Sequence, residues 1–485
     1  MNPANKTKAF LCWRNGLFIA SIILFSLVLF YPLFIAGQCL FTTDDNLGMM
    51  PFIKEVFLAQ FGGGWADHVF YGTPGLRGQI TWTPLFLGVF PSLFAFNWIH
   101  AIDLVLASIF LFFFLRANNI SRPAIALGIL AAFWLGSNFT LTYAGHISKF
   151  SILMLAAAFL VCIKKVRGNV DDWLWCIMAG GLLGLMFIEQ QDVALFFGIF
   201  LGLYALFNFI LVHFPGLFGK QPSSSAGQNE RKLVIQIVRV ALMLFIIVIM
   251  ALLVSSTTLI SSYAANVQSV SEEKKPDPRD QWEFATQWSW PPEESIDFIA
   301  PGYMGWRSGE VEGPYWGGMG RSAGWEKTGQ GFMNFKLENQ YLGAIPVIFA
   351  LFAIWAGVIG YGVTECRSKV VQGENNDSET RSCADTPIRS YSTTSTRAEI
   401  LFWFCAVILA LLLSFGKYFP LYQLFYQLPV VNNIRNPNKF LQVFQLAVGI
   451  LSAYGAHIVF NWNNLWTDRK GLTTEARKHG DKEIA

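Results

Sequence analysis

The chain has 485 residues, of which 53% are hydrophobic and 14% are charged, and its formal net charge at pH 7 is +3. A soluble domain carries roughly 25% charged residues, so this composition excludes an ordinary soluble protein. The apolar residues instead form runs of about 20, the length that crosses a bilayer. The small net charge, with no basic arm and no zinc-type spacing, predicts no nucleic-acid partner and no structural metal.

Apolar runs long enough to span a membrane recur along the chain. The first follows Lys6, Lys8 and Arg14 and predicts an uncleaved helix rather than a signal peptide. A shorter run, PLFLGVFPSLF at 84–94, is broken by prolines and is predicted to be interfacial or re-entrant. The predicted spans are 16–37, 95–115, 123–141, 147–163, 173–189, 193–212, 237–259, 341–363, 399–415 and 440–460. We therefore expect an all-α polytopic membrane protein with about 10–12 transmembrane helices.

The distribution of Lys and Arg between the short loops predicts the orientation. If the N-terminus is inside, Arg116, Arg122 and the basic segment 164–167 fall on the inner side, whereas the turns 142–146 and 189–192 carry no Lys or Arg on the outer side. This pattern predicts that the N- and C-termini are cytoplasmic.

Composition also divides the chain into modules. Segments 221–230 and 373–396 are polar and rich in Ser, Thr or Asn, which predicts flexible linkers. Segment 261–340 is dense in Trp, Tyr, Gly and Pro, which predicts a folded extracytoplasmic cap against the membrane. The predicted modules are an N-terminal transmembrane module (1–260) with a first outer loop (38–80), the cap (261–340), a C-terminal transmembrane module (341–460) with a cytoplasmic linker (364–398), and a cytoplasmic tail (461–485).

Polar residues gather at the predicted outer ends of the spans. FTTDDNLGMMP places two aspartates where the first span ends, TYAGHISKF places a His and a Lys at the start of the fourth, and IEQQDVA forms an acidic turn. LSFGKYFPLYQLFYQLPVVNNIRNPNKFLQ puts three cations on the outer face, where they are disfavoured. These residues are Asp44, Asp45, His146, Lys149, Glu189, Gln190, Asp192, Lys417, Arg435 and Lys439.

Each of these residues also has an ordinary structural interpretation. Asp44 or Asp45 fits a helix cap, a His at a helix start is commonly a packing residue, and Lys149 fits a side chain that snorkels to the headgroups. Arg435 and Lys439 fit general lipid anchors. The functional hypothesis depends on their opposite charges on one predicted face, because ionisable groups at membrane depth are costly and often mark function.

Such a face suits sugar transfer from a lipid phosphate. Cations at headgroup depth can hold a phosphate leaving group, and we expect this role for Arg435, Lys439, Lys417, His146 and Lys149. Arg435 and Lys439 are four apart, so a helix entering the last span would present both on one face. Glu189, Gln190 and Asp192 are expected to bind substrate. Asp44 or Asp45 is expected to act as the general base on an acceptor hydroxyl.

The C-terminal run GKYFPLYQLFYQLPVVNNIRNPNK resembles the signature of YfhO-type bacterial membrane proteins. TYAGHISKF is similar to that family's GH-x-x-K segment, and QWSWPPEESIDFIAPGYMG with PYWGG is similar to its outer-loop segment. That family is placed in the GT-C superfamily of glycosyltransferases, which use polyprenyl-phosphate sugars and carry an acidic residue in the first outer loop. The acidic residue maps to Asp44 or Asp45, and the adjacent pair, rather than D-x-D, leaves metal dependence open.

The resemblance implies a GT-C-type enzyme in the bacterial cytoplasmic (inner) membrane. It would transfer sugar from a polyprenyl-phosphate donor to an envelope glycan or lipid acceptor on the outer face, and no cofactor is predicted. Two alternatives stay open, namely a transporter or flippase for lipid-linked or anionic envelope precursors and a non-catalytic envelope scaffold. A transporter is expected to show polar residues near the membrane midplane.

Overall fold

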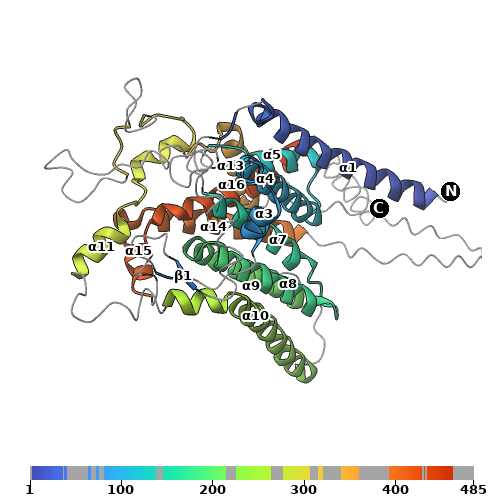
Figure 1. Ribbon diagram of the computed structural model, residues 1–485. Coiled ribbons are helices and arrows are strands. Elements are labelled where there is room, and N and C mark those ends of the chain that lie inside the picture. The colour runs from blue at the N-terminus through green and yellow to red at the C-terminus, as the bar shows by residue number, and fades with distance from the viewer. Residues whose placement is uncertain are drawn as a thin grey trace, which may run out of the picture.

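The computed structural model describes residues 3–35, 38–40, 64–66, 73–75, 81–136, 138, 146–214, 226–263, 277–305, 315–319, 340–359, 393–428, 431 and 434–462. Helices dominate these residues (Figure 1). The α-helices are α1 (Pro3–Leu29), α3 (Trp82–Val89), α4 (Ser92–Ala117), α5 (Arg122–Phe133), α7 (Ile147–Lys165), α8 (Asp172–Glu189), α9 (Gln191–His213), α10 (Ala226–Tyr263), α11 (Pro278–Thr286), α13 (Ala344–Ile359), α14 (Thr393–Ser414), α15 (Pro420–Tyr426) and α16 (Phe440–Phe460).

Short elements connect and extend these helices. The 3₁₀ helices are η1 (Tyr31–Phe34), η6 (Pro292–Phe298), η8 (Gly416–Tyr418) and η10 (Pro437–Lys439). Strands β1 (Gly64–Ala66) and β2 (Thr73–Gly75) form an antiparallel pair in which Trp65 lies opposite Pro74. This pair belongs to the predicted first outer loop.

Within the described residues, seven helical segments are long and apolar enough to cross a membrane. They are Ser92–Ala117, Ile147–Lys165, Asp172–Glu189, Gln191–His213, Leu233–Ser262, Thr396–Ser414 and Pro437–Phe460. Three shorter apolar helices are Trp13–Leu29, Arg122–Phe133 and Ala344–Ile359. All of these lie at positions where the sequence predicts a span, and the chain is a helical multi-pass membrane protein.

Two of the short helices end earlier than expected. The predicted span 16–37 ends at Leu29, after which Pro32 lies within η1. The predicted span 123–141 ends at Phe133. Just beyond it, Gly136 has φ +37°, and a Cβ there would lie 2.4 Å from the Tyr341 carbonyl oxygen. The glycine therefore permits both the turn and the close passage of the chain at Tyr341.

The linker predictions are wrong at their edges. Residues 226–230 lie in α10, and residues 393–396 lie in α14. Gln, Glu, Arg and Lys are good helix formers, so the helix that begins in the apolar run extends back through QNERK. The rest of 221–230 and 373–396 lies outside the described residues.

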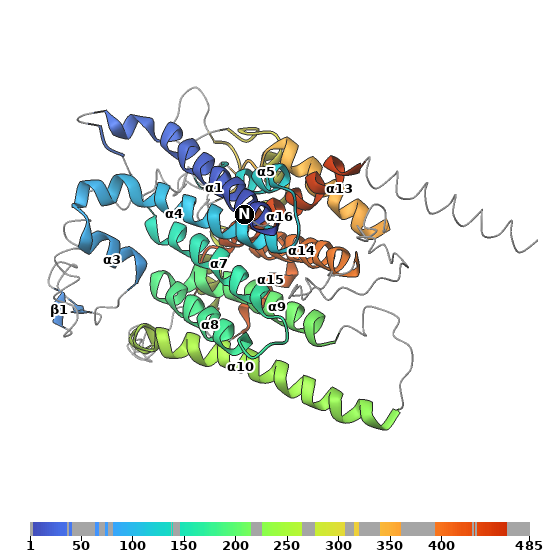
Figure 2. The same cartoon turned by 90° about the vertical axis from the view of Figure 1, so that its right-hand side faces the viewer.

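Helix α16 lies in the middle of the bundle, next to α5, α13 and α14 (Figure 2). Small residues allow this close packing. A Cβ on Gly449 would lie 2.6 Å from Ala132 Cβ, and one on Gly128 would lie 2.7 Å from Ala453 Cβ. In membranes, helices associate largely through such small-residue contacts, because lipid offers no hydrophobic driving force between them.

The described part of 261–340 packs on the chain that leads into α16. Trp290 N donates to the Ser414 carbonyl at 2.9 Å, and Asn438 N donates to the Trp288 carbonyl at 3.2 Å. The buried Trp290 ring stacks on Phe298 at 5.6 Å between centroids. Figure 1 shows α11 and α15 together at the end of the bundle opposite the start of α1.

Candidate functional site

An ion pair between α9 and η10, which directly precedes α16, forms the centre of the candidate site. Lys439 Nζ donates to Asp192 Oδ2, although the two residues are 247 positions apart. Asp192 Oδ1 also accepts from Val193 N at 2.8 Å, within the first turn of α9. Lys149 of α7 is only 7% exposed and lies close enough to interact electrostatically with Asp192. Three predicted site residues thus lie near one another at one end of the bundle, with Lys439 and Asp192 in direct contact and Lys149 within electrostatic range.

The turn between α8 and α9 is fixed by its neighbours. Gln190 is extended, with φ −161° and ψ 107°, so the two helices are separate. Glu189 Oε1 accepts from Thr83 N at 3.0 Å, and Gln190 Oε1 accepts from Ser148 Oγ at 3.3 Å. These bonds place the acidic turn against α3 and the start of α7.

His146 marks the start of α7. It occupies the N-cap position, and its carbonyl accepts from Lys149 N at 3.3 Å. The imidazole is half-buried. Since Ser148 bonds Gln190, the segment that carries His146 borders the acidic turn.

A buried carboxyl in α4 was not anticipated from the sequence. Asp103 is fully buried, and it accepts from Trp82 Nε1 at 2.6 Å and from Ser151 Oγ at 2.9 Å. Ser151 Oγ lies 2.9 Å from Thr83 Oγ1, and Thr83 N donates to Glu189. Asp103 and Glu189 are therefore joined by a short hydrogen-bonded chain. A lone Asp inside an apolar run was the available signal for it.

The first outer loop begins and ends beside this cluster. Leu40 N donates to Asn97 Oδ1 at 3.0 Å. Leu40 and Trp82 also pack on the same apolar group, which includes Ile147 at the start of α7. Asp44 and Asp45 themselves lie outside the described residues. What the structure places is therefore the two ends of the loop that carries them.

Lys417 and Arg435 lie on the chain before α16, and both are exposed. Lys417 Nζ lies over the Tyr418 ring at 5.2 Å from its centroid, and its backbone N donates to Ser289 Oγ at 3.0 Å. Arg435 Cζ lies over the Phe284 ring of α11 at 5.4 Å. Both cations are thus oriented by aromatic rings.

The prediction that Arg435 and Lys439 share a helical face is wrong. Helix α16 begins at Phe440, after η10, and Asn436 is left-handed with φ 73°. Pro437 explains the difference, because proline disfavours the α conformation in the residue before it and Asn tolerates the left-handed region. Only Lys439 reaches the Asp192 ion pair, whereas Arg435 turns toward α11.

The cap segment holds a second buried acid. Glu294 is fully buried and accepts from Tyr315 OH at 2.8 Å and from Gly318 N at 2.5 Å. A Cβ at Gly317 would lie 2.4 Å from Glu294 Oε1, so the PYWGG segment needs glycine to close around this carboxylate. Burial outweighs these hydrogen bonds and raises the pKa of Glu294 to about 7.

Asp297 lies one turn further along η6. Met304 N donates to its Oδ1 at 3.4 Å, and burial raises the pKa of Asp297 to about 6. The two buried acids of the PPEESID segment, Glu294 and Asp297, therefore fold the cap onto itself. The hydrogen bonds of these two acids lie within the cap, and the cap packs against the segment that carries Lys439.

Comparison of the chain with protein-family profiles, with curated proteins and with solved structures gives no match. The site is therefore interpreted from its own geometry. It combines a partly exposed carboxylate with two lysines, a buried Asp103 linked through Ser151 and Thr83 to the half-buried Glu189, and the two ends of the loop that carries Asp44 and Asp45. This combination can bind an anion, exchange a proton, or do both.

Proposed function

We propose that the chain is a membrane glycosyltransferase of GT-C type, which transfers sugar from a polyprenyl-phosphate donor to an envelope glycan or lipid on the outer face. The observation that carries the proposal is the Lys439–Asp192 ion pair, with Lys149 within electrostatic range, at the end of the bundle where the first outer loop begins and ends. Cations at this depth suit a lipid phosphate.

In this proposal, Lys439 and Lys149 stabilise the negative charge that develops on the leaving phosphate. Asp192 holds Lys439 in place until the donor arrives, and its 25% exposed side chain leaves it free to move aside. The general base is Asp44 or Asp45. Asp44 follows the anchored Leu40 by four residues, and four residues of chain span at most about 14 Å.

The cap supports the proposal through its contacts. Asn436 N donates to the Ala285 carbonyl at 3.1 Å and Asn438 N donates to the Trp288 carbonyl at 3.2 Å, so the cap fixes the segment that carries Lys439. Its exposed aromatic residues, such as Tyr303 and Trp316, suit stacking on sugar rings and exclusion of water from the donor.

The test is a transfer assay with purified protein in lipid nanodiscs, radiolabelled polyprenyl-phosphate sugars and envelope acceptors. The parent should form labelled product, and either Asp44→Asn or Asp45→Asn should lower turnover by about 100- to 10,000-fold, the usual contribution of a general base. Transfer at parental rates by both Asn variants would eliminate the base assignment. If the parent formed no product with any donor, the glycosyltransferase proposal would be eliminated.

A transporter is the second candidate, and the Asp103 chain is the observation that favours it. Asp103 lies near the middle of α4, fully buried, where a carboxyl suits proton or cation coupling. In proteoliposomes, a transporter would move labelled lipid-linked or anionic precursors without changing their covalent structure. Asp103→Asn should then abolish that movement.

A further inference from the structure

The opposite end of the bundle contains a polar pocket that the proposed transferase site does not use. It lies where α4, α7 and α9 end and α14 begins, and its volume is about 50 Å³. Under the predicted orientation, this end faces the cytoplasm. Its lining residues are Ala117, Asn118, Asn119, Lys164, Arg167, Asn208 and Thr396.

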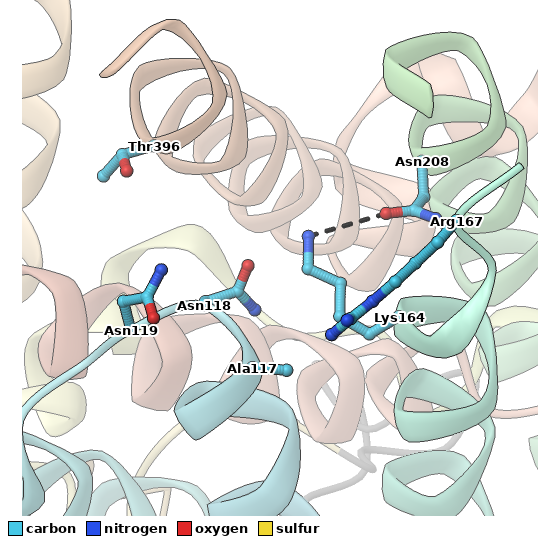
Figure 3. Close-up of a pocket in the computed structure, with 7 residues that line it drawn as sticks. All are labelled: Ala117, Asn118, Asn119, Lys164, Arg167, Asn208 and Thr396. Atoms are coloured by element: carbon cyan, nitrogen blue, oxygen red, sulfur yellow. Dashed lines mark hydrogen bonds between the residues drawn. The ribbon is translucent and has the colours of Figure 1, made fainter. Parts of the chain in front are cut away.

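The lining is unusually rich in hydrogen-bond donors. Figure 3 shows the Lys164 and Arg167 side chains on one side of the pocket and the amides of Asn118 and Asn119 on the other. Lys164 Nζ donates to Asn208 Oδ1 at 3.5 Å. These residues come from the ends of α4, α7 and α9, so the pocket exists only in the folded bundle.

Arg167 is the group that points to a ligand. It is exposed and borders the pocket, and its guanidinium has no side-chain partner among the described residues. Its backbone is held, because Arg167 N donates to Asp172 Oδ1 at 2.9 Å. A guanidinium offers a planar fork of donors that matches phosphate oxygens.

The charge of the pocket also favours an anion. Lys164 is paired with Glu399, which is only 1% exposed and also accepts from Tyr204 OH at 3.0 Å and Trp403 Nε1 at 3.2 Å. The charge of the carboxylate is thus balanced by Lys164, and the two neutral donors complete its hydrogen bonds. Arg167 then leaves the pocket with a net positive charge.

We propose that this pocket binds a phosphate group. One water takes about 10–15 Å³ of such a volume, so about 50 Å³ accommodates roughly one phosphate and excludes a whole nucleotide. Arg167 grips the phosphate oxygens, and the Asn and Thr side chains complete the hydrogen bonds, while Lys164 stays paired with Glu399. The source is either free phosphate or the headgroup of an anionic phospholipid, since basic pockets between membrane helices suit both.

The test uses the full chain in nanodiscs, with Arg167→Gln compared with Lys165→Gln. Lys165 carries the same charge at the same helix end, but its Nζ lies over the Trp175 ring at 5.9 Å. Inorganic phosphate is titrated in phosphatidylcholine nanodiscs while the thermal shift is followed. Native mass spectrometry then measures the binding of phosphatidylglycerol against phosphatidylcholine.

Arg167→Gln should weaken binding at least about tenfold, the loss of one charge-assisted hydrogen bond, while Lys165→Gln should stay within about twofold of the parent. A response to inorganic phosphate identifies free phosphate as the source, and selective phosphatidylglycerol binding alone identifies the lipid. Arg167→Lys, which keeps the charge without the fork, should fall between the parent and Arg167→Gln. Equal binding by the parent and Arg167→Gln, or an equal loss in Lys165→Gln, overturns the proposal.

Discussion

Two lysine–carboxylate pairs lie at opposite ends of the bundle, and they differ in how fully the carboxylate is bonded. Glu399 is 1% exposed and accepts from Lys164, Tyr204 and Trp403. Asp192 is 25% exposed and accepts from Lys439 and from the backbone of its own helix. We call Lys164–Glu399 the closed pair, because the protein supplies all of the carboxylate's partners. We call Lys439–Asp192 the open pair, because its carboxylate has room for another partner.

The difference separates a structural pair from one that can exchange. A buried carboxylate with every acceptor used would lose several bonds if its lysine moved, so Lys164 is held permanently. A partly exposed pair gains little net stability and can release its lysine to an incoming anion. This contrast is why the end with Asp192 is proposed as the transferase site.

The largest effect is expected from breaking the closed pair. Glu399→Gln leaves Lys164, whose side chain is 11% exposed, without its counter-charge, and removing one partner of a buried pair typically costs about 3–5 kcal/mol. Asp192→Asn should cost about 1 kcal/mol or less. Unfolding of purified protein in detergent, followed by heat or denaturant, measures both variants. Equal destabilisation would remove the distinction between the two pairs.

The cap should respond to pH through Glu294. Its pKa is about 7 in the folded cap and near 4.5 when exposed, so the folded cap retains a proton that the unfolded segment releases. Stability from this group is therefore full below pH 4.5 and falls as pH rises to about 7, by about 3 kcal/mol at most.

Protease protection of the cap between pH 4.5 and 7.5 measures this dependence. Glu294→Gln keeps the shape of the side chain without its titration, and it should flatten most of the profile. Asp297, with a pKa of about 6, should leave a smaller residual slope. A profile in Glu294→Gln that matched the parent's would assign the pH response to other groups.

The open pair should matter for donor use more than for stability. Lys439→Met should lower kcat/KM for the polyprenyl-phosphate donor by about 10- to 150-fold, the loss of one charge-assisted bond. Lys417→Met is the matched control, because Lys417 is exposed and lies over Tyr418. Steady-state kinetics at matched expression compares the two. A larger loss in Lys417→Met would place the phosphate nearer η8.

The smallest effect is expected at Arg435. Its guanidinium lies over Phe284 and outside the helix that carries Lys439, and an exposed cation–π contact is worth about 0.5–1 kcal/mol. Arg435→Lys should therefore change donor kcat/KM by about two- to fivefold. A loss as large as that of Lys439→Met would return Arg435 to a direct role on the carrier phosphate.

The sequence predicted the positions of the helices because each is a run of apolar residues, and hydropathy alone identifies such runs. It also placed Asp192, Lys149 and Lys439 on one side through loop charges. It did not predict that Lys439 contacts Asp192, since a partner 247 positions away depends on how the helices pack. Asp103 was missed although a lone Asp inside the predicted span 95–115 marked it; only its partners Trp82 and Ser151 depend on packing.

The error at Arg435 was avoidable. A spacing of four suggests a shared helical face, but Asn436 and Pro437 lie between the two cations. Proline restricts the preceding residue to non-helical conformations, and the dipeptide is a turn signal. The backbone preferences of Asn436 and Pro437, rather than the spacing of the charges, therefore determine that Arg435 and Lys439 point to different neighbours.

The most direct test is the affinity of polyprenyl phosphate for the purified protein in nanodiscs, measured for the parent, Lys439→Met and Asp192→Asn. If Lys439 exchanges Asp192 for the lipid phosphate, Lys439→Met should bind at least about tenfold more weakly. Asp192→Asn should bind as tightly as the parent or more tightly, because a competing carboxylate is gone. Unchanged binding in Lys439→Met, or a loss in Asp192→Asn equal to that in Lys439→Met, would contradict the exchange.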